Sequence, residues 1–177
     1  KARNVDYYER ITLRDSSLSA CTQAVMCAEV GQLALAHDYA HEAALVDLRD
    51  AHSNTRDGLH LASLAGSWSA IVEGFGGLRE RGEVLSLDPR LPDGITRLTF
   101  RLRRHGKRLL VEVDHDEVRC SLRDGTDARV RILLYGEPVD VAPAEPAVRP
   151  VVRLEPLLPR PQQPPGRSPL PHDVMPA

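Results

Sequence analysis

One short stretch, DGLHLASLAGSW, brings two glycines, a histidine and two serines to the start of an apolar helical pattern. The first turn of a helix leaves main-chain N–H groups without intrahelical partners and carries a partial positive charge, so it attracts anions. His60, Ser63 and Ser67 would add side-chain donors, and Gly58 and Gly66 would let the main chain approach a ligand closely. The stretch is therefore a candidate anion site, and the ordinary alternative is a small-residue contact between packed helices.

The loop just before it, RDAHSNTRDG, is dense in side chains that donate, accept or move protons. These are Asp50, His52, Asn54, Arg56 and Asp57. Such a density is what a polar pocket needs, and a solvated loop contains the same residue types. The loop alone does not decide between the two.

His37 and His41 are four residues apart in HDYAH, a spacing that puts both rings on one face of a helix, where they could bind a metal ion. No glutamate follows the first histidine and no third ligand is evident. The sequence therefore favours two partly exposed helix histidines and predicts no metal site. Cys21, Cys27 and Cys120 match neither a disulfide framework nor a metal-binding pair, and they favour a reducing, cytoplasmic compartment.

Length and charge bound the remaining choices. With 177 residues the chain has room for one domain or two small ones, and a formal net charge of −2 gives no attraction to nucleic acid or to an anionic membrane. No apolar run approaches the ~20 residues that cross a bilayer. The sequence opens on lysine, in what reads as a loop already in progress, and this predicts a fragment of a longer protein.

Three helices are expected to position the candidate residues. DSSLSACTQAVMCAEVG begins with N-cap residue types and ends at Gly31, and QLALAHDYAHEAALVDL follows it with small side chains that suit close helix packing. The third helix carries apolar residues at helical spacing, which predicts a core stripe. The stripe consists of Leu64, Trp68, Ile71, Val72 and Phe75.

From residue 83 the hydrophobic period changes to two, and the turns RHGK, DHDE, RDGT and YGEP separate the runs. Alternation without intervening helices is typical of an antiparallel sheet or a small sandwich. The residues expected to face its core are Leu98, Phe100, Leu102, Leu109, Val111, Val113, Val118, Cys120, Leu122, Val130, Ile132, Leu134, Val139 and Val141.

Beyond residue 142 both periods vanish, and eleven of the chain's 14 prolines lie there. This composition predicts a disordered or polyproline-like tail over 143–177. Segments such as PLLPRP could also serve as ligands for proline-recognising domains.

Three segments carry a family resemblance: YYERITLRDSSLSA, AHSNTRDGLHLASLAGSWSAIVEGFGGLR and LSLDPRLPDGITRLTFRLRRHGKRLLVEV. In order and spacing they resemble the C-terminal part of glycoside hydrolase family 65, which contains inverting phosphorylases of maltose, trehalose and kojibiose together with some hydrolases. The resemblance runs from about Tyr7 to Val141. It implies an α+β multidomain protein, with the last helices of an (α/α)6 barrel over 1–82, a small antiparallel β-sandwich over 83–142 and the tail after it.

The resemblance also implies a role for the opening stretch, because its family counterpart lies beside bound phosphate. On that basis His60, Ser63 and Gly66, with the main chain around Ala65, would hold inorganic phosphate next to the anomeric carbon. A carboxylic acid would protonate the glycosidic oxygen while phosphate attacks the opposite face, with inversion. Residues expected to line the active site are Arg14, Asp15, Arg56 and Asp57. Where Arg14 stands the family often has histidine, and arginine cannot shuttle a proton at neutral pH.

The family's general-acid glutamate belongs to an earlier barrel motif, and neither Glu73 nor Glu83 has that context. No catalytic residue is therefore expected in this chain, and the chain alone is expected to be inactive. The implied partners are an α-linked glucose disaccharide and inorganic phosphate as co-substrate, without cofactor or metal, and a homodimer in the full-length form. Two alternatives stay open: a trehalase-like hydrolase that uses water, and a non-catalytic remnant or interaction piece.

Overall fold

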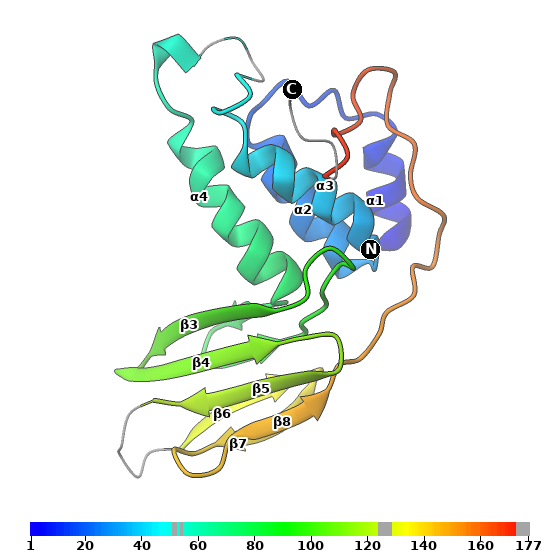
Figure 1. The fold of residues 1–177 in the computed structure, drawn as a ribbon. Helices are drawn as coiled ribbons and strands as arrows, with labels where there is room; N and C mark the ends of the chain where they lie inside the picture. Colours follow the sequence, from blue (N-terminus) through cyan, green and yellow to red (C-terminus); the bar gives the residue numbers. More distant parts are fainter. Residues whose placement is uncertain (51–52, 54, 124–128, 173–177) are drawn as a thin grey trace. The chain divides into compact units, whose positions relative to one another are not determined.

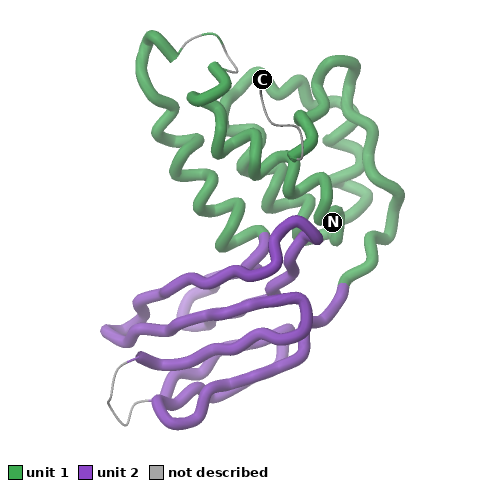
Figure 2. Tube along the Cα trace, in the orientation of Figure 1, with its two compact units in different colours: residues 1–74, 154–177 green, residues 75–153 purple. Residues whose placement is uncertain are grey.

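The computed structural model describes residues 1–50, 53, 55–123 and 129–172. The chain divides into two compact units, one formed by residues 1–74 with 154–177 and the other by 75–153 (Figure 2). We refer to them as the helical unit and the sheet unit. The sequence had placed its boundaries after residues 82 and 142.

The helical unit contains the three expected helices and one more (Figure 1). Its elements are α1 (Ala2–Glu9), α2 (Ser19–Glu29), α3 (Leu33–Ala44), a short 3-10 turn (Thr55–Asp57) and α4 (Leu61–Ser69), which runs on as a π-helical stretch (Ala70–Phe75). The first residues, read as a loop from the sequence, form α1 because Val5 and Glu9 recur on one face and both are buried. None of the described helices is long and apolar enough to cross a bilayer.

Two glycines fix the direction in which α4 runs. A Cβ atom added at Gly66 would lie 2.4 Å from the Cys21 Sγ atom, and one added at Gly74 would lie 3.6 Å from the Cα atom of Val25. Residue numbers therefore increase in the same sense along both helices, so α2 and α4 run in the same direction and begin at the same end. The end of α3 lies there too, because the Ser63 hydroxyl donates a hydrogen bond to the Ala43 carbonyl oxygen.

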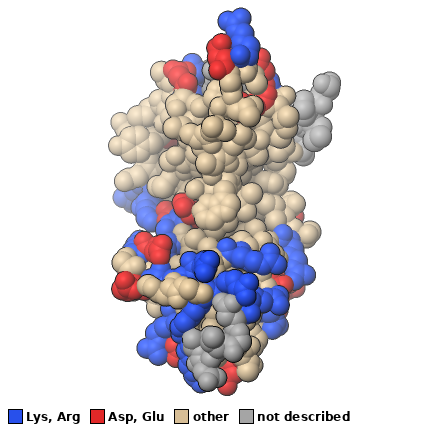
Figure 3. All heavy atoms as spheres, turned by 90° about the vertical axis from the view of Figure 1, so that its left-hand side faces the viewer, with Lys and Arg blue, Asp and Glu red and all other residues tan. Residues whose placement is uncertain are grey.

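The predicted core stripe of the third helix is only half buried. Val72 and Phe75 are buried, whereas Leu64, Trp68 and Ile71 are exposed, with 53% of the Trp68 surface open to solvent. No element in the described part of the chain covers that side of α4. Viewed from this side, the helical unit shows mainly uncharged residues, and Lys and Arg gather over the sheet unit (Figure 3).

The sheet unit consists of two four-stranded sheets, ordered β1-β2-β6-β7 and β3-β4-β5-β8. Its strands are β1 (Arg79–Arg81), β2 (Val84–Leu87), β3 (Leu98–Arg104), β4 (Lys107–Val113), β5 (Glu117–Leu122), β6 (Val130–Leu134), β7 (Glu137–Val141) and β8 (Ala147–Pro150). The expected alternation is confirmed for β3 to β7: eleven of the predicted inward residues are buried, and Leu98, Leu102 and Val130 are half-buried. The RDGT turn falls largely outside the described residues.

The sheets differ from the expectation in three strands. β1, β2 and β8 were not predicted, and β2 pairs with β6 in parallel, with Ser86 opposite Leu133. The strand pairs of the unit are therefore mostly, but not all, antiparallel. A parallel pair joins segments distant in sequence, so alternation within one segment cannot reveal it.

The proline-rich tail was predicted to be disordered or polyproline-like, and the structure differs at Ala147–Pro150, which form a strand. β8 belongs to a sheet, and residues 154–172, although without helix or strand, lie along the helices and form hydrogen bonds with α1, with α3 and with Gln32, which precedes α3. We call residues 154–172 the C-terminal strap. Because proline has a fixed φ, ordering such a segment loses less conformational entropy than composition alone suggests.

Candidate functional site

The end of the helical unit at which α2 and α4 begin holds most of the residues singled out from the sequence. Arg14 and Asp15 precede α2, and His60 immediately precedes α4. Because α2 and α4 start side by side, residues separated by more than forty positions share one end of the unit. This end is the candidate site.

His60 is held by an aspartate that the sequence analysis did not single out. The His60 Nδ1 atom lies 2.6 Å from Asp47 Oδ1, and the main-chain N–H of His60 donates to the same carboxylate, with its nitrogen 3.0 Å from Oδ2. The hydrogen bond from the His60 ring, more than that from its N–H, lowers the pKa of Asp47 below its usual value. An ionised carboxylate only accepts, so Nδ1 carries the proton and the ring orientation is fixed.

The Asp47 carboxylate therefore lies at the start of α4, where the helix favours negative charge. The first intrahelical hydrogen bond of α4 runs from the Leu64 N–H to the His60 carbonyl oxygen. The amides that a helix start leaves over are those before Leu64, at Ala62 and Ser63. Ala65, expected to contribute its main chain, lies beyond this first turn, where main-chain N–H groups donate to carbonyl oxygens of the same helix.

Ser63 and Gly66 were expected to bind phosphate, and their surroundings instead show helix packing. The Ser63 side chain is fully buried and donates to Ala43 of α3. Gly66 faces Cys21 of α2 at a distance that leaves no room for a Cβ atom. Ala65, whose main chain was expected to take part, is exposed, whereas Ser63 and Gly66 face neighbouring helices.

Arg14 was expected to line an active site, but its side chain is only 7% exposed. Its guanidinium lies over the Tyr39 ring, 4.7 Å from the ring centre, and donates to Gln23 Oε1 at 3.0 Å. It also donates to Glu42 and to the Arg167 carbonyl oxygen. Arg14 thus ties the segment before α2 to α3 and to the strap, with a main chain in the left-handed region at φ +60°.

The other predicted lining residues are more open. Asp15 is exposed and accepts a hydrogen bond from Arg167 Nη1 at 2.5 Å. Arg56 and Asp57 are both exposed and form a loose ion pair with each other, 3.8 Å apart. His52 and Asn54 of the same loop lie outside the described residues. The described part of the loop therefore supplies exposed charge near the start of α4.

Among the described residues, no group of three or more His, Cys, Asp or Glu side chains is placed to hold a metal ion. The His37 ring stacks on the His172 ring of the strap with the two centres 3.9 Å apart. Burial, and then the neighbouring His172, lower the pKa of His37 below its usual value.

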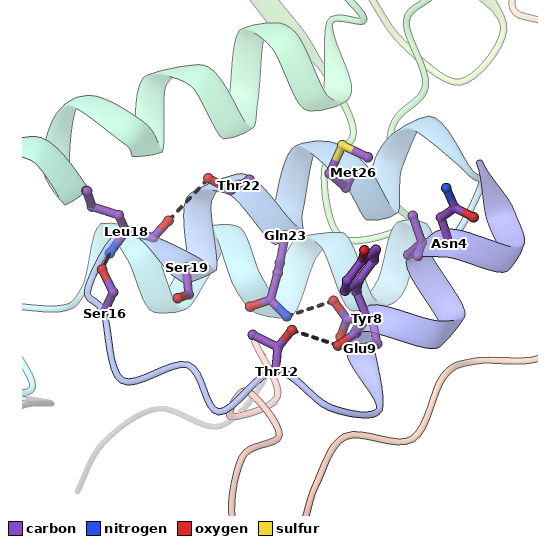
Figure 4. Close-up of a pocket in the computed structure, with 11 residues that line it drawn as sticks. Asn4, Tyr8, Glu9, Thr12, Ser16, Leu18, Ser19, Thr22, Gln23 and Met26 are labelled. Atoms are coloured by element: carbon purple, nitrogen blue, oxygen red, sulfur yellow. Dashed lines mark hydrogen bonds between the residues drawn. The ribbon is translucent and has the colours of Figure 1, made fainter.

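A groove of about 540 Å³ lies between α1 and α2 (Figure 4). Polar and apolar residues both line it, its exposed surface is mainly apolar, and Glu9 is among its lining residues. Glu9 accepts hydrogen bonds from Gln23 at 2.7 Å, from the Tyr39 hydroxyl at 2.5 Å and from Gln163 of the strap at 2.8 Å. Three donors hold this buried carboxylate in place, so it acts as an anchor for the packing of α1 rather than as an acid aimed at a ligand.

Two family models match the chain, each within one compact unit. The model of the glycosyl hydrolase family 65 central catalytic domain matches residues 1–69, and that of the family 65 C-terminal domain matches residues 78–141. The candidate site falls in the first match, and strands β1 to β7 fall in the second.

Relatives come from the same family. A protein of Mycobacterium leprae described as an "uncharacterized glycosyl hydrolase" is 62% identical over 170 residues, which is 96% of this chain and 22% of the relative. The alpha,alpha-trehalose phosphorylase of Geobacillus stearothermophilus is 40% identical over 140 residues, which is 79% of this chain and 18% of the relative.

A solved structure described as "Putative kojibiose phosphorylase from human microbiome" has the same fold over 82% of this chain, with a TM-score of 0.75 and 29% identity. The match spans 20% of that protein, so the chain corresponds to about a fifth of the length of these proteins. With both family models matched in order and relatives up to 62% identical, the chain belongs to glycosyl hydrolase family 65.

Proposed function

We propose that the full-length protein cleaves an α-linked glucose disaccharide by phosphorolysis, and that this chain contributes one wall of the active site. The observation that carries the proposal is the His60–Asp47 pair at the start of α4, inside the match to the central catalytic domain. Relatives named as trehalose and kojibiose phosphorylases support the reaction class.

In this proposal His60 contacts phosphate through its Nε2 atom. Asp47 holds Nδ1 and thereby orients the opposite edge of the ring, as a carboxylate bonded to a functional histidine commonly does. The amides of Ala62 and Ser63 and the partial charge of α4 favour an anion beside the ring. Ser63 and Gly66 contribute indirectly, because their contacts with Ala43 and Cys21 set the position of α4.

Arg14 and Asp15 take part through the segment that leads into α2. Arg14 is engaged with Gln23 and Glu42, so we assign it to holding this segment rather than to proton transfer. The general acid of the inverting displacement would come from another part of the full-length protein.

We further propose that the helices belong to an (α/α)6 barrel. Two features support it: α2 and α4 begin at the end where α3 ends, and the apolar residues Leu64, Trp68 and Ile71 of α4 are exposed. An exposed apolar helix face and an apolar groove between α1 and α2 are what a ring of helices would cover.

The test is to incubate the full-length protein with trehalose, kojibiose and maltose, with and without inorganic phosphate, and to measure sugar release. Phosphorolysis predicts cleavage that requires phosphate and yields one glucose 1-phosphate for each free sugar. Cleavage at the same rate without phosphate, giving two free sugars, contradicts the proposal.

A water-using hydrolase is the second candidate, and two observations favour it. Ser63 and Gly66 face the neighbouring helices α3 and α2, and Asp47 already supplies a negative charge at the start of α4. Both features reduce what this chain offers to a phosphate ion. The same incubation separates the two candidates, since only the phosphorylase makes a phosphorylated product.

A further inference from the structure

The C-terminal strap contacts the rest of the helical unit at five places. It passes Gly31 at the end of α2, where a Cβ atom would lie 2.8 Å from the Leu154 carbonyl oxygen and where φ is +83°. Next, Gln32 Nε2 donates to the Leu158 carbonyl oxygen at 2.7 Å. Gly31 therefore has both a conformation and a clearance that another residue would lack. The position is shaped for the strap to pass.

The strap is anchored next at a buried aspartate of α3. Asp38, with 4% of its side chain exposed, accepts hydrogen bonds from Arg160 at 2.6 Å and from the Nδ1 atom and main-chain N–H of His172, at 2.9 and 3.0 Å. Although burial alone would raise it, the hydrogen bonds from Arg160 and His172 lower the pKa of Asp38. Both partners belong to the strap, so the charge of Asp38 is compensated only while the strap lies in place.

Between Arg160 and His172 the strap reaches α1 and the segment that leads into α2. Gln163 donates to Glu9, the Arg167 side chain donates to Asp15, and the Arg167 carbonyl oxygen accepts from Arg14. Arg14 and Asp15 are consecutive and directly precede α2. One strap residue thus holds both of them, through its side chain and its main chain.

The strap lies outside both family matches, the second of which ends at residue 141. The aligned 170 residues of the Mycobacterium leprae relative extend well into it, since only seven residues of this chain are left over. Arg14 and Asp15, by contrast, lie inside the first family match, so the strap contacts a segment that belongs to the match.

We propose that the C-terminal strap is a positioning element, which holds Arg14 and Asp15 and thereby fixes the segment entering α2 at the end of the unit that bears the candidate site. Its kinetic consequence rests on the proposed function. Without the strap Arg14 keeps its contacts with Gln23, Glu42 and Tyr39, whereas Asp15 loses the hydrogen bond from Arg167.

The test uses the full-length protein with Arg160→Met, which leaves Asp38 without its guanidinium, and Arg167→Met, which removes only the exposed link to Asp15. Arg153→Met is the matched control, because Arg153 is exposed and precedes the strap. Arg160→Lys keeps the positive charge beside Asp38 and is expected to behave between the wild-type protein and Arg160→Met. Circular dichroism establishes that each variant is folded.

The first measurement is amide hydrogen exchange in peptides covering residues 10–24, where the Ser19 N–H donates to the Ser16 carbonyl oxygen at 3.0 Å. We expect exchange there to be at least about tenfold faster in both test variants, and unchanged in Arg153→Met and in peptides of β4. Unchanged exchange over residues 10–24 in both test variants overturns the proposal.

The second measurement separates positioning from stability. Arg167→Met is expected to raise KM for phosphate at least about threefold, with kcat at saturating phosphate within about twofold. Faster exchange with an unchanged phosphate KM in a phosphate-dependent enzyme overturns the positioning role. If the enzyme releases only free sugars, the proposed function fails instead, and the exchange result still decides whether the strap holds this segment.

Discussion

Gly66 offers a sharp test of whether the small residues of α4 serve packing. Replacing it with alanine places a Cβ atom 2.4 Å from Cys21 Sγ and 2.7 Å from Cys21 Cβ, so the two helices must move apart or Cys21 must shift. Overpacking of this kind costs about 1–3 kcal/mol. Alanine also gains about 1 kcal/mol over glycine from its helix propensity.

The expected net effect of Gly66→Ala is a loss of about 0–2 kcal/mol in the free energy of unfolding. Gly74 provides the matched control in the same contact between α2 and α4. A Cβ atom there would lie 3.6 Å from Val25 Cα and 3.8 Å from Ala28 Cβ, which is ordinary contact. Gly74→Ala is therefore expected to be neutral or stabilising, by up to about 1 kcal/mol.

Urea unfolding followed by circular dichroism gives both free energies. Gly66→Ala should be less stable than Gly74→Ala by about 1–3 kcal/mol, and adding Cys21→Ala should recover part of the difference, because Sγ is then absent. If Gly66→Ala is as stable as Gly74→Ala, the packing explanation is wrong. A raised KM for phosphate at unchanged stability would instead indicate that Gly66 contributes to phosphate binding.

Three further outcomes are expected. His60→Ala should raise KM for phosphate at least about tenfold, measured by steady-state kinetics. Ser63→Ala should instead lose its hydrogen bond to Ala43, which costs about 0.5–1.5 kcal/mol in the free energy of urea unfolding, and should leave KM for phosphate within about twofold. Because burial lowers the pKa of His37 and His41 below 6.5, the unfolded chain binds protons that the folded chain resists, so the melting temperature should fall as pH drops from 6.5, and replacing both by glutamine should reduce that fall. Burial raises the pKa of Cys120 to about 12, so iodoacetamide should modify it at pH 8 only after unfolding, and rapid modification of the folded protein would contradict its burial.

The strands were the most predictable part of the fold. In β4 and β5, residues such as Val111 and Cys120 face a core formed by the same unit, so alternation within each segment is enough to find them. β8 was hidden by Pro146, which directly precedes it, and by Pro150, its last residue. The parallel pairing of β2 with β6 depends on residues almost fifty positions apart, which no local pattern encodes.

The α4 stripe shows the limit of helical periodicity. Helical spacing correctly marks Leu64, Trp68 and Ile71 as one apolar face, but burial also needs a partner on that side. The described residues supply none. The pattern therefore predicts where a partner would bind rather than which residues form the core of this chain.

The candidate site was found from sequence only at its histidine. Asp47 lies thirteen positions before His60 and carries no spacing signal, so its role emerges only when α3 and α4 pack. The strap was missed because proline content predicts disorder, while its anchors, such as Arg160 on Asp38, are single charged residues far apart in the chain.

The most direct test of the central claim is to follow trehalose or kojibiose cleavage by the full-length protein in phosphate buffer with proton NMR, and to identify the first sugar product before it mutarotates or reacts further. Phosphorolysis with inversion predicts that β-glucose 1-phosphate appears first, in step with one free sugar. Free glucose as the first product, with phosphate unconsumed, would contradict the account.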